Sequence, residues 1–560
     1  MKKISVLLVV ALLFTLLTGF SAQAADHAQT RGGVVGDLDG DGKVNNEDVA
    51  YLLWHTLFPE DYPLTTNGDF NRDDAVNNED VAYLLWHTLF PEDYPLDDSC
   101  VTHLDENNNG LCDLCNTNVR VVIDLYAVND LHGKLADGKN HPGVDELSTY
   151  IENARKSKDN VILLSSGDMW QGAAESNLTH GKIITDWMNE MDFVSMTLGN
   201  HEFDWGQEKI RENAELAQFP ILGINVYDNQ TGSQVDYCQN SVVVECDGVQ
   251  VGIIGAIGDC YSSISADRSQ GIHFKTGSAL TNLIKAEATR LRKEGVDFVV
   301  LSAHDDYEEG YYDTSLSNGY IDLVFEGHTH QRYAQKDTYG VYHLQGGGDN
   351  SGITTATVTY NLANDSYTVS GSAIRTSSYS SLPDHPVVAQ LLEKYDDQVS
   401  QAYRVLGYNR TKRDDSVVEQ YVANLYCDAG LDKWGSQYNI VLGGGFLQTR
   451  SPYNLAAGQV TYGDLMSLLP FDNRLVLCRI QGKYLLSRFI NNTSSDYYVA
   501  LSPYGSQIRN SIANNSYYYV VVDSYTAYYS YNRLTIVEFY DDNVYARDLL
   551  AQYIAEGNLS

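Results

Sequence analysis

Five short apolar segments, each followed directly by residues that commonly bind metals, constrain the fold of this chain more than any other feature. The segments span residues 121–125, 161–164, 193–198, 298–301 and 321–325. Each is rich in β-branched or aromatic residues and is bounded by Gly or Asp, a pattern that predicts strands of an α/β sheet. Because ligands collect at the carboxyl ends of such strands, residues that are distant in the sequence meet in one crevice.

The polar residues that follow these segments are of the types that bind divalent cations. They are Asp130, His132, Asp168, Asn200, His304, His328 and His330. Carboxylates, imidazoles and a carboxamide suit a dinuclear divalent-metal centre better than a thiolate zinc site. The segment 199–204 is the sharpest signal, because packing alone does not require Asn, His, Glu and Asp together after a buried strand.

A second pair of residues lies beside these predicted ligands. His201 directly follows Asn200, and Asp204 stands three residues further on, where one helical turn brings it against a ring nitrogen of His201. A plain helix cap is the alternative interpretation of this pair. A zincin site is excluded, because the second His of H-E-x-x-H is absent.

The order of these motifs resembles that of the calcineurin-like metallophosphatases, and among them the secreted 5'-nucleotidases. The shared pattern is D-x-H, G-D, G-N-H-E, a lone His and G-H-x-H. The resemblance implies that one cation is held by Asp130, His132 and His330. It implies that the other is held by Asn200, His304 and His328, with Asp168 bridging both. His201 and Asp204 would stabilise the transition state or protonate the leaving group. Zn, Mn, Co and Fe are not distinguished.

The resemblance also implies a fold and a domain order. We expect an α/β fold, in which a four-layer metallophosphatase β-sandwich flanked by helices spans residues 119–380. A linker helix would span 381–402, and an α/β C-terminal 5'-nucleotidase domain 403–560. In that domain Phe471 and Tyr525 would stack on the base of the substrate, and Arg450 is the cation nearest the glycines at 443–445.

The expected activity is hydrolysis of nucleotide phosphate esters by metal-activated water. A 2',3'-cyclic nucleotide phosphodiesterase or a UDP-sugar hydrolase is the alternative within the same chemistry. An alternative of another class is a non-catalytic surface protein that docks through the repeats described next. The complete ligand set favours the enzyme.

Residues 44–64 and 76–96 are identical, and each copy follows a loop with oxygen donors at EF-hand spacing. The predicted calcium ligands are Asp37, Asp39, Asp41, Lys43, Asn45 and Asp48 in the first loop and Asp69, Asn71, Asp73, Ala75, Asn77 and Asp80 in the second. The second loop has Asp74 where the first has Gly42, so we expect weaker binding there. Residues 25–98 thus predict a small EF-hand-like α module that resembles a dockerin, which implies a cohesin-like extracellular partner. A calcium-rigidified spacer is the alternative.

The N-terminal region carries two further signals. Residues 1–24 combine two lysines, an apolar run and Ala22-Gln23-Ala24, which predicts a cleaved signal peptide and a secreted or surface-attached protein. Within residues 99–118, the group Cys100, His103, Cys112 and Cys115 has the spacing of a small zinc knuckle. Disulfides are the competing interpretation in an exported chain, and Cys238 with Cys246 would suit a hairpin.

Charge and hydropathy limit the partners of the chain. The formal net charge of −37 argues against nucleic acid polymers and anionic membranes, which need clusters of Lys and Arg. No segment after the signal peptide approaches the roughly 18 apolar residues of a transmembrane helix, so we expect a protein without one. We expect a nucleotide or another small phosphate ester as substrate.

Overall fold

The computed structural model describes most of the chain after residue 118 and parts of the chain before it. The described residues are 36–39, 43–59, 61–64, 68–70, 75–91, 94, 96, 119–137, 142–264, 268–446, 455, 457–494, 497–541 and 543–556. The N-terminal module and the remainder of the chain are taken separately below. None of the described helices is long and apolar enough to cross a membrane.

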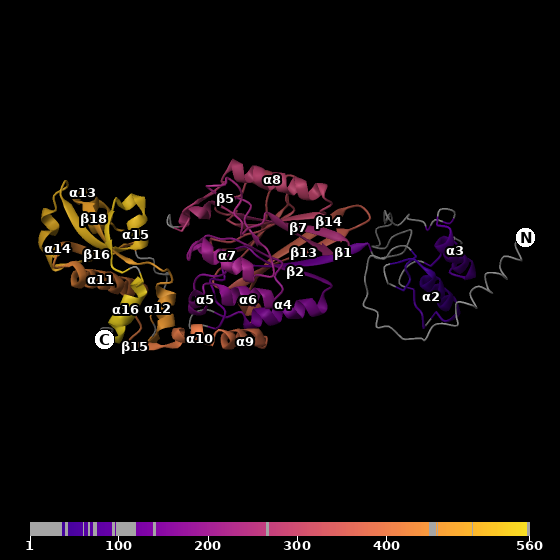
Figure 1. Ribbon diagram of the computed structural model, residues 1–560, viewed down its shortest axis with the longest axis horizontal. Helices are drawn as coiled ribbons and strands as arrows, with labels where there is room; N and C mark the ends of the chain where they lie inside the picture. Colours follow the sequence, from indigo (N-terminus) through magenta and orange to yellow (C-terminus); the bar gives the residue numbers. More distant parts are fainter. Residues whose placement is uncertain are drawn as a thin grey trace, which may run out of the picture. The chain divides into compact units, whose positions relative to one another are not determined.

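Two six-stranded sheets form the centre of the region from residue 119 to 375 (Figure 1). The first has the order β14-β13-β1-β2-β3-β4. Its strands are β1 (Arg120–Val128), β2 (Asn160–Ser165), β3 (Ser195–Thr197), β4 (Ile221–Leu222), β13 (Gly352–Asn361) and β14 (Ser366–Arg375). The second has the order β11-β12-β10-β9-β7-β6. Its strands are β6 (Ser241–Cys246), β7 (Val249–Ile257), β9 (Phe298–His304), β10 (Leu323–Phe325), β11 (Arg332–Lys336) and β12 (Tyr342–Gly346).

The central strands of both sheets are parallel. In the first sheet β2, β3 and β4 run parallel, and in the second β7, β9, β10 and β12 do so. Parallel strands covered on both faces are apolar along their whole length, which explains the unbroken hydrophobic segments of the sequence. Five strands of the two sheets overlap the five segments predicted as strands; they are β1, β2, β3, β9 and β10.

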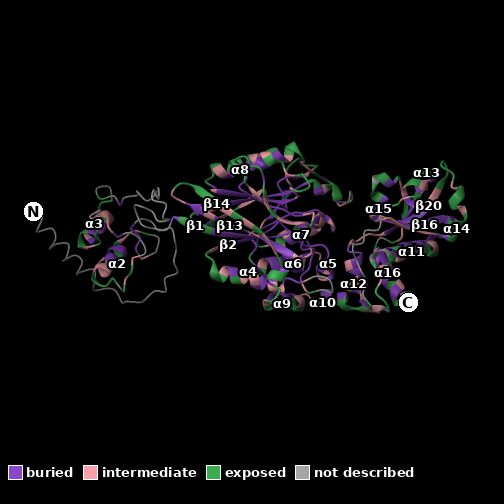
Figure 2. Ribbon diagram, turned by 180° about the vertical axis from the view of Figure 1, so that it is seen from behind, coloured by how far each residue is buried: buried purple, intermediate pink, exposed green. Residues whose placement is uncertain are grey.

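Helices cover the outer face of each sheet. On the first sheet lie α4 (Asp145–Ser157), α6 (Lys182–Glu190) and α7 (Gln207–Leu216), with α5 (Ala174–Thr179) beside them. On the second lies α8 (Ser278–Lys293), whose Ile284 and Leu291 pack in one core with Val299 of β9. Figure 2 shows the strands largely buried and the outward faces of α4 and α8 exposed. The result is the predicted four-layer arrangement of helices, two sheets and helices.

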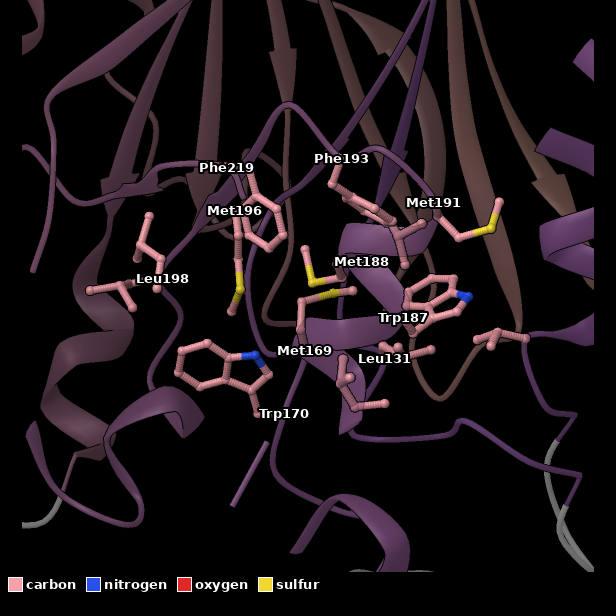
Figure 3. Close-up of a cluster of buried hydrophobic side chains, with 14 of the residues drawn as sticks. Leu131, Met169, Trp170, Trp187, Met188, Met191, Phe193, Met196, Leu198 and Phe219 are labelled. Atoms are coloured by element: carbon pink, nitrogen blue, oxygen red, sulfur yellow. The ribbon is translucent and has the colours of Figure 1, made fainter. Parts of the chain in front are cut away.

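A second core lies directly beneath the loops that carry the predicted ligands. Leu131 and Met169 are fully buried there, although each stands next to a predicted metal ligand in the sequence. Figure 3 shows both side chains among Trp187, Met188 and their apolar neighbours. Alternate residues of these loops are therefore anchored in the core, which holds the polar residues between them in place.

The chain continues through two short helices into the C-terminal region. Where one linker helix was predicted over 381–402, the structure has α9 (Pro386–Lys394), α10 (Asp396–Val399) and a 3₁₀ turn (Ser400–Tyr403). Pro386 begins α9, as proline suits the first helical position. The hydroxyl of Tyr395 donates to Asp186 of α6 at 2.7 Å, which ties the linker to the first helical layer.

A five-stranded sheet with the order β19-β16-β20-β18-β21 forms the C-terminal region. Its strands are β16 (Ile440–Phe446), β18 (Leu475–Gln481), β19 (Tyr497–Leu501), β20 (Tyr517–Asp523) and β21 (Thr535–Phe539). The helices are α11 (Asp415–Trp434), α12 (Tyr462–Leu468), α13 (Gly482–Tyr484), α14 (Pro503–Ile508), α15 (Ser524–Tyr528) and α16 (Ala546–Ala555). Two-stranded pairs are formed by β15 (Val405–Asn409) with β17 (Gly458–Thr461) and, earlier in the chain, by β5 (Val226–Asp228) with β8 (Ile272–Phe274). This mixed α/β architecture agrees with the prediction.

The N-terminal module contains two helices of identical sequence, α2 (Asn46–Leu57) and α3 (Asn78–Leu89). Leu52 of the first and Leu84 of the second are fully buried in a shared core. Each helix starts with a capping box in which Asn45 or Asn77 is the N-cap residue. The module is thus a pair of loop-helix units, as the repeat predicted.

Candidate metal centre

The seven predicted metal ligands lie at the end of a strand or in the loop that follows it. Asp130 and His132 follow β1, Asp168 follows β2 and Asn200 follows β3, whereas His304 is the last residue of β9 and His328 and His330 follow β10. The first five are buried, His328 is partly buried, and the side chain of His330 is 39% exposed. The convergence expected from parallel strands is therefore present.

One group of donors is formed by Asp130, His132 and His330, whose ligand atoms all lie within 4.8 Å of one another. His132 Nε2 is 3.0 Å from His330 Nε2, and His330 Nε2 is 3.4 Å from Asp130 Oδ1. Two nitrogens each bound at about 2.0–2.1 Å to one cation, at a right angle, are about 3 Å apart. This group therefore fits a divalent cation.

Adjacent donors surround a second position. Asp130, Asp168 and His304 form another group within 4.8 Å, which places Asp168 next to both sets. His328 Nδ1 is 3.1 Å from Asn200 Oδ1. His304 Nε2 is completely buried, lies 3.1 Å from Asp168 Oδ2, and has no hydrogen-bond partner among the described residues. A buried nitrogen without a hydrogen-bond partner costs free energy unless it binds something, so the residues fit a second cation.

The buried imidazoles are oriented by the backbone. His132 Nδ1 lies 2.9 Å from the carbonyl of Gln171, and His304 Nδ1 lies 2.7 Å from that of Ser166. An N–H donated from Nδ1 to a carbonyl leaves Nε2 unprotonated, which is the form that binds a metal. Both rings are thereby held with Nε2 toward the other ligands. Against burial, which lowers it, Asp168 and Asp130 raise the pKa of His304 to about 10, so this ring must lose its Nε2 proton when a cation binds.

The backbone of these loops is strained. Five of the seven predicted ligands have φ between 48° and 81°; they are Asp130, His132, Asp168, His328 and His330. Residues other than glycine rarely adopt this left-handed region, and each instance costs on the order of 1–3 kcal/mol. Such conformations cluster at functional sites, where they aim side chains that a regular strand or helix would point elsewhere.

In the metal-free protein, buried charged groups at this centre strongly shift one another's pKa values. Burial acts to raise the pKa of Asp168, but the imidazoles of His304 and His201 outweigh it and hold the pKa well below its usual range. Burial and repulsion from His304 lower the pKa of His328 to about 4. His328 is therefore neutral near pH 7, as a metal ligand must be.

His201 and Asp204 form the predicted pair beside this centre. His201 begins a 3₁₀ turn (His201–Phe203), and its Nδ1 donates to Asp204 Oδ2 at 2.8 Å. The ring lies edge-on to His132, with 5.3 Å between ring centroids. It also stacks on Phe471, at 5.6 Å and 25° between ring planes.

Comparison with known proteins identifies the two main parts of the chain. Residues 123–332 match the family model of the calcineurin-like phosphoesterases, and residues 398–499 match that of the 5'-nucleotidase C-terminal domain. The chain thus carries a calcineurin-like phosphoesterase region followed by a 5'-nucleotidase C-terminal region. It is accordingly a metal-dependent phosphoric ester hydrolase of the 5'-nucleotidase type.

Individual relatives of this phosphoesterase agree with the family models. It is 24% identical over 406 residues to an apyrase of Tabanus yao, covering 66% of this chain and 72% of the relative. It is 25% identical over 414 residues to a 5'-nucleotidase of Diplobatis ommata, covering 66% and 70%. The crystal structure of a 5'-nucleotidase precursor from Thermus thermophilus superimposes with a TM-score of 0.60 at 19% identity, covering 78% of this chain and 96% of that one.

Glu202 is a residue of the phosphoesterase centre that sequence reasoning left without a role. Its buried carboxylate accepts hydrogen bonds from the backbone N–H groups of Gly199, Asp168, Met169 and Trp170, at 2.7 to 3.3 Å. It therefore joins the loop after β2 to the loop after β3. The only signal in the sequence was its place inside the polar segment 199–204.

Asn129 has a similar function for the first loop. Its Nδ2 donates to Asp130 Oδ2 and to the carbonyl of Gly347, both at 2.7 Å, while its Oδ1 accepts from Gly346 N at 2.9 Å. The side chain thereby orients the Asp130 carboxylate against β12. No spacing rule points to this contact, because Gly346 and Gly347 are more than 200 residues away in the sequence.

The predicted base-stacking residues lie on neighbouring segments of the C-terminal domain. Phe471 is partly buried, and its carbonyl accepts from Arg547 Nη1 at 3.1 Å. Tyr525 stacks on Tyr529 with 6.4 Å between centroids and 7° between planes. The two segments are linked by Ser524, whose hydroxyl donates to Asn473 Oδ1 at 3.2 Å. Arg450 lies outside the described residues.

In the first calcium loop, the described carboxylates Asp37, Asp39 and Asp48 have oxygen atoms within 4.8 Å of one another. Asp41, Asn71 and Asp73 lie outside the described residues, as do the predicted signal peptide and the group Cys100, His103, Cys112 and Cys115. Cys238 and Cys246 are both buried and carry free thiols. No disulfide joins them, so the hairpin disulfide considered above is wrong.

Proposed function

We propose that this phosphoesterase removes phosphate from nucleotide 5'-monophosphates, using two divalent cations. One cation position is formed by Asp130, His132 and His330. The other would be formed by Asn200, His304 and His328, and Asp168 would be the ligand that the two cations share. The observation that carries the proposal is a pair of three-donor groups, Asp130 with His132 and His330 and Asp130 with Asp168 and His304, which share Asp130. Divalent cations at these positions would lower the pKa of an attacking water and neutralise the phosphate oxygens.

The residues around the cations supply positioning and proton transfer. Asp204 Oδ2 accepts a hydrogen bond from His201 Nδ1 at 2.8 Å. This contact fixes the orientation of the ring, and the carboxylate favours the charged form of the imidazole. The charged ring would stabilise phosphate oxygens in the transition state and donate a proton to the leaving ribose oxygen. The ring lies edge-on to His132, with 5.3 Å between centroids, which supports a role toward a phosphate ester bound at the predicted centre.

Substrate recognition is assigned to the C-terminal domain. Stacking of a nucleobase on an aromatic side chain contributes about 1–3 kcal/mol per base to binding. Phe471 reaches the ring of His201, so a base held on Phe471 would lie within reach of the predicted centre. This arrangement favours a nucleotide over a simple phosphate ester.

We also propose that residues 1–24 direct export and that the two loop-helix units bind calcium and a cohesin-like partner.

A cyclic-nucleotide activity is the second candidate. The chain is 28% identical over 245 residues, 39% of its length, to a 2',3'-cyclic-nucleotide 2'-phosphodiesterase/3'-nucleotidase of Yersinia enterocolitica. The same pair of cations would serve either reaction, so the choice depends on how the ribose is presented.

The test is a substrate panel with Mn²⁺-loaded protein: AMP, a UDP-sugar, 2',3'-cyclic AMP and an aryl phosphate. We expect AMP to have the highest kcat/KM and Asp168→Asn to lose at least about 10³-fold, as expected when a bridging ligand is removed. Asp365→Asn is the matched control, because Asp365 shares the left-handed backbone but lies in the turn between β13 and β14. Release of no phosphate from any substrate, or equal rates for Asp168→Asn and wild type, would reject the proposal.

A further inference from the structure

The thiol of Cys260 lies beside the second group of predicted ligands. Its Sγ is within 4.8 Å of a ring nitrogen of His304 and of a ring nitrogen of His328, and the side chain is 4% exposed. Four other described cysteines, at positions 238, 246, 427 and 478, are buried as well. Among the described residues, none of those four belongs to such a group of donors.

The fold holds this thiol close to His304. Strands β7 and β9 pair in parallel, with Ile257 opposite His304. Just beyond β7, Gly258 N donates to the carbonyl of His304 at 3.0 Å, and Cys260 Sγ donates to the same carbonyl at 3.1 Å. A Cβ atom on Gly258 would lie 1.8 Å from Asp305 Oδ2, so only glycine permits this approach. The 3₁₀ turn Asp259–Ser263 is thereby fastened to the end of β9.

A second observation points to a ligand at this place. His304 Nε2 is fully buried and makes no aligned hydrogen bond within the described part of the chain; it lies 3.1 Å from Asp168 Oδ2, which is itself a predicted ligand. Buried polar nitrogens are nearly always satisfied by protein, water or an ion. A cysteine, an unsatisfied imidazole and a second imidazole within ligand distance form a donor set of the kind that borderline-soft cations select.

We propose that Cys260 Sγ is an additional ligand of the cation held by Asn200, His304 and His328. The inference rests on the proposed dinuclear centre and adds a donor that the motifs do not contain. On binding, the thiol loses its proton to solvent, and a sulfur–cation bond replaces the weak hydrogen bond to the His304 carbonyl. The two positions then differ chemically. The Asp130 group offers only oxygen and nitrogen, whereas the His304 group includes sulfur and prefers Zn²⁺ over Mn²⁺ or Mg²⁺.

The test uses Co²⁺ as a spectroscopic probe in the metal-stripped full-length protein. Thiolate bound to Co²⁺ gives a near-ultraviolet charge-transfer band, while the visible ligand-field bands report the cation itself. We expect the wild type to show the charge-transfer band and both Cys260→Ser and Cys260→Ala to lack it while keeping the visible bands. Cys246→Ser is the matched control, because Cys246 is also buried but lies at the end of β6. Difference spectra against each variant cancel any contribution from Cys100, Cys112 and Cys115.

A binding measurement complements the spectra. Competition with a chelator should show that Cys260→Ala lowers the affinity for one of the two Zn²⁺ ions by at least about 10-fold and leaves the affinity for the other unchanged. Identical charge-transfer bands in wild type and in both Cys260 variants, or unchanged Zn²⁺ affinity, would overturn the proposal. His328→Ala separates this failure from failure of the centre itself. If the visible bands of that variant match those of the wild type, the predicted dinuclear site is wrong. The proposed role of Cys260 is then wrong as well.

Discussion

The backbone N–H of Asp168 donates to the carboxylate of Glu202 at 2.9 Å, so the predicted bridging ligand is held by the residue that follows His201. The same carboxylate accepts from Gly199 N at 2.7 Å. Glu202 is fully buried and belongs to the segment that also carries Asn200. The spacing between Asp168 and Asn200 therefore depends on one side chain that is not itself a predicted ligand.

Replacement of Glu202 should damage stability and activity together. Glu202→Ala leaves four buried N–H donors without an acceptor, each costing on the order of 1–3 kcal/mol unless water enters. Glu202→Gln keeps one acceptor oxygen and should recover part of the loss. Thermal unfolding and kcat/KM on AMP measure both effects. Glu208→Ala, in the first turn of α7, is the control and should behave as wild type. Equal damage from Ala and Gln would contradict the hydrogen-bond explanation.

Phe471 should govern the affinity for the base and not the chemical step. Loss of a stacking ring costs about 1–3 kcal/mol, which corresponds to a rise in KM for AMP of roughly 5- to 150-fold. Phe471→Ala should show this rise, and Phe471→Tyr should retain most of the affinity. The rate on an aryl phosphate without a base should change little. Tyr528→Ala, which changes an exposed aromatic residue of the C-terminal domain, is the control. An equal loss on both substrates would assign Phe471 to the centre through its contact with His201.

The stability of the C-terminal domain should depend on pH through Asp523. Burial raises the pKa of Asp523 to about 6, against the opposing effect of hydrogen bonds from Thr526. Because the folded-state pKa lies above the unfolded value of about 3.9, the folded domain favours the protonated form. The contribution of Asp523 to stability is greatest below about pH 4 and falls as the pH rises to about 6, by about 3 kcal/mol in total.

Asp523→Asn should remove this dependence. Asn cannot ionise, and it still accepts the hydrogen bond from Thr526 N that begins α15. Denaturant unfolding of wild type and variant between pH 4 and 7 measures the difference, which should widen with pH in favour of the variant. Parallel curves for the two proteins would show that Asp523 does not titrate in this range.

Calcium should stabilise the N-terminal module, and its two loops should differ in affinity. Binding to the folded module alone adds about 2.7 kcal/mol at a concentration 100 times Kd. Isothermal titration should resolve two sites, of which Asp39→Ala abolishes the tighter one. Asp74→Gly, which copies the Gly42 of the first loop, should strengthen the weaker one. Two equal sites in the wild type, or no calcium binding, would contradict the prediction.

The arrangement of the strands and the clustering of the candidate ligands at their ends were predictable because they depend on local pattern. The apolar segment 298–301 lies within β9, and His304 ends that strand, where a parallel sheet exposes it to the crevice. The His201–Asp204 contact follows from a spacing of one helical turn. Both inferences need only the periodicity of the chain and the common direction of parallel strands.

Other features depend on the tertiary fold and have no local signature. The left-handed backbone of Asp130 and His330 is imposed by the core beneath the loops and by hydrogen bonds such as that from Asp349 N to Asp130 O, at 2.8 Å. Cys260 comes near His304 only through the pairing of β7 with β9. The division of the predicted linker helix into α9 and α10 occurs at Tyr395, whose hydroxyl bonds to Asp186 across the fold.

The most direct test of the dinuclear centre is a crystal structure of the Zn²⁺-soaked protein with anomalous scattering recorded at the zinc edge. We predict two peaks about 3.5–4 Å apart, with an Asp168 oxygen bound to each. One peak should lie within bonding distance of His132 and His330, and the other within bonding distance of His304 and His328. A single peak, or two peaks that Asp168 does not reach, would contradict the dinuclear centre.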